Sequence, residues 1–576
     1  MILSALFFAI FAPGREVSPA LGSPPSAQQA IAEPPGEANR VIELTFTAAH
    51  DHADPFNTID VDVTFTSPSS RVIRVPAFWA GGKTWRVRYA SPEVGVHTYV
   101  TSCTDTNDKG LQQVAGRVQV VPYMGDNPLF RHGAIRVASD RRHFEHADGT
   151  PFFWLGDTWW MGLCERLKWP DEFHTLAVDR RTKGFTVVQI VAGLYPDMPA
   201  FDPRGKNEAG FPWTENYGQI RPEYFDQADR RIAHLVDQDL VPCVVLAWGY
   251  HLPWTGVEKM KKHVRYVMAR YGAWPVVWCM AGEVNLPYYL EKGFPRGGEK
   301  QTNSWEGVIR FARTVNGCER LITVHPTGIE PLSGRLLWHD QTLLDFDMLQ
   351  TGHGKKEVLR PTIRTVRASY AARPVMPVVD GEVSYEALLG TIPAEIPRLM
   401  FWTCMLSGAA GHTYGANGIW QLNRRDRPYG KSPHGGTYGP IPWDDAMCLP
   451  GSRQLGLAKA FLLRFPWQRL EPHPEWATWA SARKSADEFD VPYTAGVAET
   501  LRITYAPDAQ PVKCLNLDPK RDYLARSFDP VSGITVNLGT VHPDAKGTVS
   551  VSPPEGSKTD WVLVLDAKST GVPQGK

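Results

Sequence analysis

Two glutamates stand at the ends of apolar runs that are typical of buried strands. Glu283 closes the run VVWCMAGE (276–283), and Glu382 closes the run VMPVVDGE (375–382). A buried charge is costly, so each strand either ends at solvent or at an arginine partner, or opens into a pocket where the carboxylate has a role. Because side chains alternate along a strand, Asp380 and Glu382 are expected on one face, and Glu283 on the same face as Cys279.

Two carboxylates facing each other across a gap the size of a sugar ring suit one chemistry well. Hydrolysis of a glycosidic bond with retention needs one carboxyl group that donates a proton and one ionised carboxylate that attacks, about 5–5.5 Å apart. Their environments must keep the first protonated and the second charged near neutral pH. We therefore predict that Glu283 and Glu382 are the catalytic residues.

The elements that must position them alternate between short apolar runs and amphipathic helices. This alternation predicts the α/β class and a (β/α)8 TIM barrel, in which Glu283 and Glu382 end the fourth and seventh strands. A doubly wound parallel sheet is the rival, but neither GxGxxG nor GxxxxGK[ST] follows any strand. The eight expected strands lie within residues 151–157, 185–191, 240–248, 276–283, 320–326, 346–353, 375–382 and 408–414.

Chemistry in such a barrel is expected at the carboxyl ends of the strands, and nearly every run ends in polar groups. These groups could bind sugar hydroxyls or stack on sugar faces. Asp157 with its two neighbouring tryptophans could instead be a helix cap and core aromatics, and Tyr385 could simply begin a helix. The predicted substrate-binding residues are Asp157, Trp159, Trp160, Gln189, Trp248, His251, His325, Gln350, His353, Asp380, Tyr385, His412 and Tyr414.

The barrel offers little sign of a metal centre. His325, His353 and His412 end strands, but none of them belongs to an HxH or HExxH pattern, so they are expected to be polar pocket residues. The eight cysteines form no CxxC pair and no metal spacing, and most are expected to be buried thiols. We predict that catalysis uses no metal and no cofactor; a metal-dependent hydrolase is a less favoured alternative.

The sequence predicts a small β-domain at each end of the chain. Alternating apolar and polar runs punctuated by turn residues predict one β-sandwich before the barrel and another after it. The first residues, ILSALFFAIFA, resemble the apolar part of a secretory signal but lack a basic start, and a linker rich in proline follows. The expected organisation is 1–37 signal and linker, 38–124 sandwich, 125–468 barrel and 469–576 sandwich and tail, in a secreted or periplasmic protein.

Composition narrows the range of partners. Lys plus Arg and Asp plus Glu both number 61, so no net charge favours nucleic acid. After the short apolar start, no stretch is long enough to span a membrane. The 20 Trp and 19 Tyr supply flat rings of the kind that stack on sugars. The expected partner is a carbohydrate, and the oligomeric state is open, with a monomer plausible.

Three segments carry a resemblance to a known family. GTPFFWLGDTWW, VVWCMAGEVN and MPVVDGEVSYE resemble the apiosidase-like bacterial glycoside hydrolases, whose barrels belong to a large clan of retaining enzymes. The preceding VPAFWAGGKTWRVRYASPEVGVHTY is similar to a domain often fused to these barrels, and the C-terminal sandwich resembles a module labelled collagen-binding. The resemblance implies Glu283 as acid/base and Glu382 as nucleophile. Many clan members carry asparagine before the acid/base to bind the sugar 2-hydroxyl, whereas this chain has Gly282.

Together these observations predict a retaining glycoside hydrolase that acts on a plant or microbial polysaccharide or oligosaccharide. The alternative from a different class is a catalytically inactive barrel that serves as a carbohydrate-binding or surface-adhesion protein. The presence of both glutamates argues against that alternative.

Overall fold

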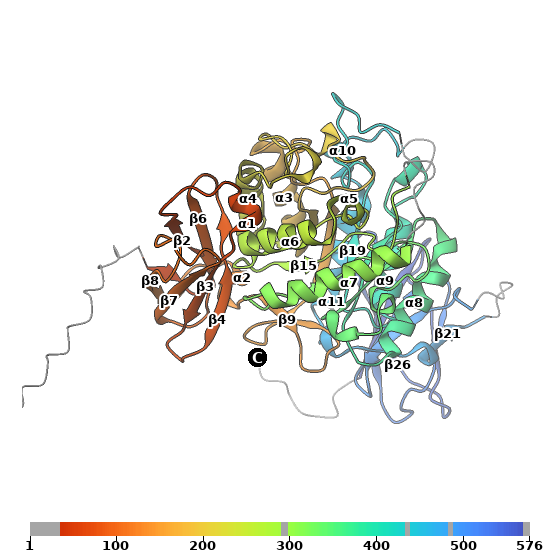
Figure 1. Ribbon diagram of the computed structural model, residues 1–576. Helices are drawn as coiled ribbons and strands as arrows, with labels where there is room; N and C mark the ends of the chain where they lie inside the picture. The colour runs from red at the N-terminus through yellow and green to blue at the C-terminus, as the bar shows by residue number, and fades with distance from the viewer. Residues whose placement is uncertain (1–34, 290–297, 432–437, 482–487, 568–576) are drawn as a thin grey trace, which may run out of the picture.

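The computed structural model describes residues 35–289, 298–431, 438–481 and 488–567. A central barrel lies between two sets of β-sheets (Figure 1). The N-terminal strands, red to brown, lie on the left of the barrel in this view, and the blue C-terminal strands lie at its lower right. Residues 1–34, where a signal and most of the linker are expected, lie outside the described residues, so export stays a prediction.

The barrel contains one strand in each of the eight apolar runs. The strands are parallel and follow the order β16-β15-β14-β13-β12-β19-β18-β17, which forms a nearly closed ring. The (β/α)8 prediction is confirmed. The strands are β12 Trp154–Trp159, β13 Val187–Val191, β14 Val241–Val245, β15 Val277–Cys279, β16 Ile322–Thr323, β17 Asp347–Gly352, β18 Val378–Val383 and β19 Gly411–Tyr414.

Helices between the strands cover the outside of the ring. A small sheet of β9 Ile135–Val137, β10 Phe144–His146 and β11 Pro151–Phe152 lies at the amino end, where Phe144 packs on Trp154 and Phe346. The opposite, carboxyl end of the barrel is therefore the end available for a site. The helices between the barrel strands are α3 Asp171–Thr182, α4 Pro222–Asp237, α5 His251–Thr255, α6 Val257–Tyr271, α7 Gly298–Val315, α8 Leu359–Ala371 and α9 Glu395–Met405, while α2 Pro128–Arg131 precedes the barrel and α10 Trp443–Ala446 and α11 Pro450–Leu462 follow its last strand.

The N-terminal region is a β-sandwich around its own apolar core. One sheet has the order β1-β8-β7-β3-β4 and the other β2-β6-β5. Alternation of buried and exposed residues along β2 explains why one face of that strand packs inward. The elements are β1 Gly36–Glu37, β2 Ile42–Thr47, α1 Pro55–Thr58, β3 Val61–Thr66, β4 Val72–Pro76, β5 Phe78–Trp79, β6 Thr84–Tyr89, β7 Gly95–Cys103 and β8 Ala115–Val121.

The C-terminal region is a second β-sandwich, as the sequence predicts. Its sheets have the orders β20-β22-β23-β28-β25-β26 and β21-β24-β27. The strands are β20 Glu471–Pro472, β21 Ala477–Trp479, β22 Tyr493–Val497, β23 Leu501–Ala506, β24 Val512–Cys514, β25 Tyr523–Phe528, β26 Thr535–Val541, β27 Val549–Val551 and β28 Trp561–Ala567.

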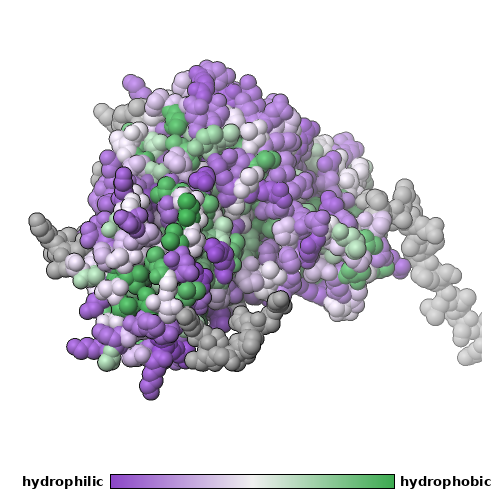
Figure 2. All heavy atoms as spheres, turned by 180° about the vertical axis from the view of Figure 1, so that it is seen from behind, coloured by the Kyte–Doolittle hydropathy of each residue, from purple (hydrophilic) through white to green (hydrophobic). Residues whose placement is uncertain are grey.

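Buried ion pairs join both sandwiches to the barrel. Arg88 of β6 contacts Asp229 of α4 at 2.6 Å, and Arg398 of α9 forms a two-pronged pair with Asp560 at 2.8 and 2.7 Å. Paired guanidinium and carboxylate groups of this kind fix orientation as well as distance. The outer surface is mainly hydrophilic on the face seen in Figure 2, with apolar residues gathered in patches between polar ones.

Candidate active site

A pocket of about 350 Å³ opens at the carboxyl ends of the barrel strands. Glu283 and Glu382 both line it. Its other walls are largely aromatic and aliphatic side chains, which exclude water and strengthen electrostatic interactions between the polar groups they surround. The lining residues are Trp160, Pro196, Asp197, Trp248, Glu283, Leu286, Thr327, Gly328, Ile329, Gln350, Gly352, His353, Glu382, Tyr385, Leu388, Leu389, Trp420 and Tyr438.

A β-bulge turns Glu382 into this pocket. Asp380 pairs with Leu349 of β17, but the next partner, Gln350, pairs with Glu382, so Gly381 is the extra residue. A side chain at Gly381 would approach Met348 Cγ to 2.6 Å, and the Gly381 carbonyl accepts a hydrogen bond from Gln189 Nε2 at 2.9 Å. The bulge, which bends the strand and re-aims the following side chain, is therefore supported from inside the barrel.

The segment that follows β14 holds both the backbone next to Glu283 and the Glu283 carboxylate. Glu283 has φ +42°, in the left-handed region that glutamate rarely occupies, and such strain persists only where the surroundings enforce it. Trp248 Nε1 donates to Glu283 Oε2 at 3.1 Å. A Cβ at Gly282 would lie 2.3 Å from the Trp248 indole. The glycine before Glu283 therefore makes room for the indole that binds its carboxylate.

One amide links the two carboxylates. Gln350 Nε2 donates to Glu283 Oε1 and to Glu382 Oε1, each at 3.1 Å. These two oxygens can lie no farther apart than the two bonds laid end to end. The side chains, from strands far apart in the sequence, thus meet in one pocket.

The electrostatic surroundings of Glu283 favour its protonated form. Burial raises the pKa of Glu283 to about 7, and the negative charges of Glu382 and Asp197 act in the same direction. Near neutral pH this carboxyl group can therefore hold a proton or release it, which is the property that a general acid and base requires.

Glu382 is in the opposite situation. Burial alone would raise its pKa, but hydrogen bonds and positive charge from His325 and His353 outweigh burial and hold the pKa of Glu382 well below its usual range. His353 Nε2 lies 2.8 Å from Oε1, and His325 Nε2 lies 3.2 Å from Oε2. Burial lowers the pKa of His353, but the Glu382 carboxylate raises it by a larger amount, so the net shift of this pKa is upward. Glu382 is thus kept ionised.

Several buried polar atoms of the pocket have no hydrogen-bond partner within the described residues. They are Gln350 Oε1, the Tyr385 hydroxyl and Trp420 Nε1. Buried polar groups are nearly always satisfied, so a cluster of unsatisfied ones around two carboxylates fits a ligand rich in hydroxyl groups. Burial, with the nearby Glu382 charge, raises the pKa of Tyr385 far above its usual range, so its hydroxyl stays protonated.

The structure brings about half of the residues singled out from the sequence into the pocket wall. Two more contact the wall from behind: His325 faces Glu382, and Gln189 supports the Gly381 carbonyl. Those in the wall are Glu283, Glu382, Trp160, Trp248, Gln350, His353 and Tyr385.

Asp157 and Trp159 point away from the pocket, and their expected contact with substrate is corrected. Asp157 is fully buried and pairs with Arg180 of α3 at 2.6 Å, while Trp159 donates to Asp157 and packs on Phe173. These side chains face the helices around the barrel rather than its interior. They stabilise the contact of β12 with α3.

The same correction applies to Asp380, His412 and Tyr414. Asp380 lies 3.4 Å from Cys404 of α9, and its partner in the ladder, His412, packs on Phe401 of the same helix. Tyr414 donates to Glu386 on the outer side, at 2.5 Å. Regular alternation would place the side chains of Asp380 and Glu382 on the same face of β18. The bulge at Gly381 turns these two side chains to opposite faces.

His251 is the remaining correction. Its Nε2 lies 3.0 Å from the Tyr195 carbonyl oxygen and its Nδ1 3.3 Å from the Tyr217 hydroxyl, outside the pocket. Burial lowers its pKa to about 3, so it is a neutral structural histidine. It opens α5 rather than ending β14, which is why its position in the sequence is misleading.

Loop residues of the pocket escape the sequence analysis. Asp197 follows β13 and accepts hydrogen bonds from Tyr289 and from Tyr438, the latter at 2.7 Å. Trp420 follows β19. The signal that could have found Asp197 is its place six residues after an apolar strand; nothing in the sequence indicates that Tyr438 would meet it.

Comparison with known proteins identifies the barrel. A family model described as apiosidase-like, catalytic domain, matches residues 138–469, more than half of the chain. The chain belongs to the apiosidase-like family. It is therefore a glycoside hydrolase, and the alternative of an inactive binding barrel is not favoured. A second model, a domain of unknown function (DUF5060), matches residues 37–104, and no curated protein matches the chain.

Solved structures share the architecture of this apiosidase-like protein. A glycoside hydrolase family 5 structure from Bacteroides vulgatus ATCC 8482 is 22% identical, with a TM-score of 0.65, over 78% of this chain and 96% of that one. A structure named glycoside hydrolase is also 22% identical, with a TM-score of 0.62, over 77% and 99% of the two chains. At these identities the likeness shows the shared fold.

The described residues include no helix that is long and apolar enough to cross a membrane.

Proposed function

We propose that this apiosidase-like enzyme hydrolyses its glycoside with retention, with Glu382 as nucleophile and Glu283 as acid and base. The observation that carries the proposal is the single Gln350 amide that binds both carboxylates through two 3.1 Å bonds. Because both bonds start at one nitrogen atom, the two carboxylate oxygens must lie closer together than about 6.5 Å, which is the shortest separation typical of inverting enzymes. The bonds allow the separation of about 5–5.5 Å that is typical of retaining enzymes.

In the first step, ionised Glu382 attacks the anomeric carbon while protonated Glu283 transfers its proton to the departing oxygen. The bond to the leaving group breaks as the glycosyl ester with Glu382 forms. The opposite pKa shifts of the two residues support these roles, because each carboxyl group starts the step in the protonation state it needs.

In the second step, Glu283, now ionised, removes a proton from water, and the water oxygen attacks the anomeric carbon. The ester to Glu382 breaks, and both residues return to their starting states. A pKa of about 7 suits this double use, because it balances the tendencies to give up and to accept the proton.

The substrate class we propose is a plant or microbial polysaccharide or oligosaccharide. The aromatic walls of the pocket, including Trp160, Trp248 and Trp420, can pack on sugar faces, and the unsatisfied polar atoms can bind hydroxyl groups. Many members of the clan that this chain resembles carry asparagine before the acid/base. This chain has Gly282 there, and a Cβ at Gly282 would collide with the Trp248 indole, so recognition of the 2-hydroxyl is expected to differ.

The test has two stages. The purified protein is first screened against a panel of plant and bacterial glycans, with released sugars identified by chromatography. Proton NMR then follows the anomeric signal of the first product formed from the best substrate, before mutarotation. We expect the product to have the configuration of the substrate. Release of the opposite anomer would overturn the retaining mechanism while leaving glycoside hydrolysis itself intact.

A further inference from the structure

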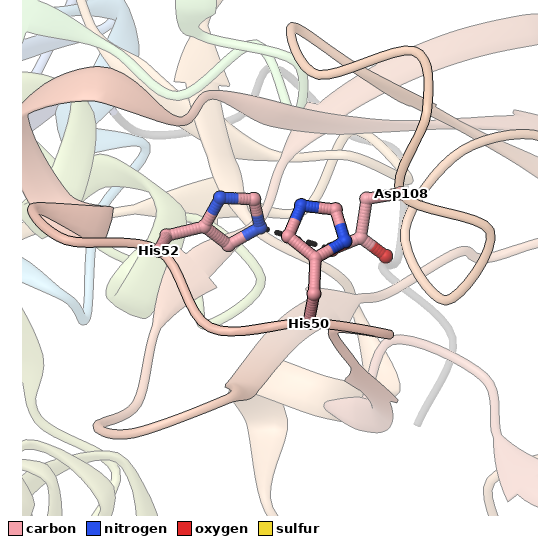
Figure 3. A group of neighbouring side chains, drawn as sticks. All are labelled: His50, His52 and Asp108. Atoms are coloured by element: carbon pink, nitrogen blue, oxygen red, sulfur yellow. Dashed lines mark hydrogen bonds and ion pairs between the residues drawn. The ribbon is translucent and has the colours of Figure 1, made fainter.

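A second group of residues with chemical potential lies in the N-terminal sandwich. His50 and His52 stand on the segment that follows β2, and Asp105 and Asp108 stand between β7 and β8. Figure 3 shows the two imidazoles side by side on one segment, with Asp108 reaching them from another. None of these residues lines the catalytic pocket.

Their donor atoms converge. His52 Nε2 lies 2.9 Å from Asp108 Oδ2, and His50 Nε2 lies 3.0 Å from Asp105 Oδ2. The crossed distances are also short: His50 Nδ1 lies 3.9 Å from Asp108 Oδ2, and His52 Nδ1 lies 4.0 Å from Asp105 Oδ2. One donor atom each from His50, His52 and Asp108 fall within 4.8 Å of one another.

The Asp108 carboxylate is fixed in direction before any ion binds. Its Oδ1 accepts the backbone N–H groups of Ala49 and Gly110, both at 2.9 Å. That leaves Oδ2 aimed at the imidazoles. Orientation of a ligand carboxylate by hydrogen bonds from outside the coordination sphere is typical of metal sites in proteins.

Exposure rises in steps from one side of the cluster to the other. The Asp108 side chain is fully buried and that of His52 is 9% exposed, whereas that of His50 is 48% exposed. A buried carboxylate under two imidazoles, one of them open to solvent, provides both an anchor and an entry path for an ion.

We propose that His50, His52, Asp105 and Asp108 form a structural site for a divalent transition metal of the zinc class. Imidazole and carboxylate ligands together suit Zn²⁺, whereas Ca²⁺ and Mg²⁺ prefer oxygen ligands alone. Zinc bonds of about 2.0–2.2 Å require the side chains to draw together slightly, with the ion replacing the protons now shared between histidine and aspartate.

A metal ion at this site would stabilise the interface between the N-terminal sandwich and the barrel. The segment with both histidines leads directly into α1, where Asn57 Nδ2 donates to the Gly218 carbonyl of the barrel at 3.0 Å. Phe56 of the same helix packs on Trp213 and Tyr266 of the barrel. An ion that ties this segment to the loop between β7 and β8 would thus hold α1 in place.

The experiment uses the full-length protein without an affinity tag, treated with a chelator and dialysed. Zn²⁺ is titrated by calorimetry, bound metal is counted by mass spectrometry, and thermal unfolding is followed with and without the ion. We expect one saturable Zn²⁺ per chain and a Tm raised by about 3 °C, since an ion that binds only the folded state stabilises it. Ca²⁺ and Mg²⁺ should produce no such shift.

Two variants locate the ion. His52→Gln and the double variant His50→Gln with His52→Gln should lose the bound Zn²⁺ and the Tm shift. His542→Gln is the matched control, because His542 also pairs with an aspartate, Asp522, at 2.6 Å but has no second histidine described beside it. It should bind as the parent does.

Folding of the variants is checked separately. Circular dichroism of each metal-free variant should match that of the metal-free parent, so that lost binding reflects lost ligands. Absence of saturable Zn²⁺ binding by the parent would overturn the proposal. So would Zn²⁺ binding that survives in the double variant, because the ion would then lie elsewhere in the chain.

Discussion

The ends of β15 and β18 carry the same residue type in the same pocket, yet their carboxyl groups behave in opposite ways. Glu283, after β15, has an indole and an amide as its hydrogen-bond donors, and burial raises its pKa to about 7. Glu382, on β18, faces two histidines, which hold its pKa well below the usual range. The residue type does not decide the role; the charge and donors around it do.

The comparison also shows how each environment is built. Neutral donors leave the burial penalty on Glu283 largely uncompensated, whereas the histidines at the ends of β16 and β17 offset it for Glu382. The two carboxylates raise each other's cost of ionisation, so ionising Glu382 helps to keep Glu283 protonated.

Removal of the nucleophile should have the largest effect. Glu382→Gln should lower kcat by on the order of 10⁴-fold or more on every substrate, because the variant lacks the carboxylate that forms the glycosyl ester. Steady-state kinetics measure the loss. Glu386→Gln is the matched control: Glu386 is also buried but faces Tyr414 and Gly451 outside the pocket, so its loss should leave kcat within a few-fold of the parent.

Removal of the acid and base should depend on the leaving group. Glu283→Gln should lower kcat by about 10²–10⁴-fold on natural glycosides, which need a proton on the departing oxygen. A dinitrophenyl glycoside of the same sugar should still react quickly in the first step, since its leaving group needs no proton. The intermediate should then accumulate, and a burst of dinitrophenolate should be visible by absorbance.

Azide separates the two roles further. It needs no general base, so it should restore turnover of Glu283→Gln and give a glycosyl azide of retained configuration. If azide rescued Glu382→Gln instead and left Glu283→Gln unchanged, the two assignments would be reversed.

The pH profile should report the raised pKa. Since Glu283 must be protonated to act as the acid, kcat/KM should fall as pH rises through about 7, approaching tenfold per unit. Asp197→Asn removes a negative charge that raises this pKa, so the alkaline limb should move to lower pH by a fraction of a unit. A shift to higher pH would contradict the electrostatic account of Glu283.

Asp157, whose side chain faces away from the pocket at the end of β12, should contribute more to stability than to activity. Asp157→Asn removes one of the two carboxylates that pair with the buried Arg180 and leaves only Asp179, which should cost about 2 kcal/mol of the free energy of unfolding. Below the new Tm, kcat should stay within about threefold of the parent, because Asp157 does not touch the pocket. Denaturant unfolding measures the first effect and steady-state kinetics the second. A large loss of kcat in stably folded protein would mean that Asp157 acts on the site.

The sequence by itself determined the barrel and the two glutamates. Apolar runs alternating with amphipathic helices are a local pattern, so all eight strands could be located without the fold. The chemistry of strand ends then drew attention to Glu283 and Glu382, and to neighbours such as Trp248, Gln350 and His353 that line the same pocket.

Tertiary structure alone decided which strand-end residues face inward. Alternation predicts direction only while pairing is regular, and the bulge at Gly381 turns Asp380 toward α9 while Glu382 enters the pocket. The bulge depends on pairing with β17 and on the hydrogen bond from Gln189 of β13, which are contacts between distant segments. The same limit applies to loops: Asp197 meets Tyr438, and His52 meets Asp108, because the fold brings together residues that no local pattern connects.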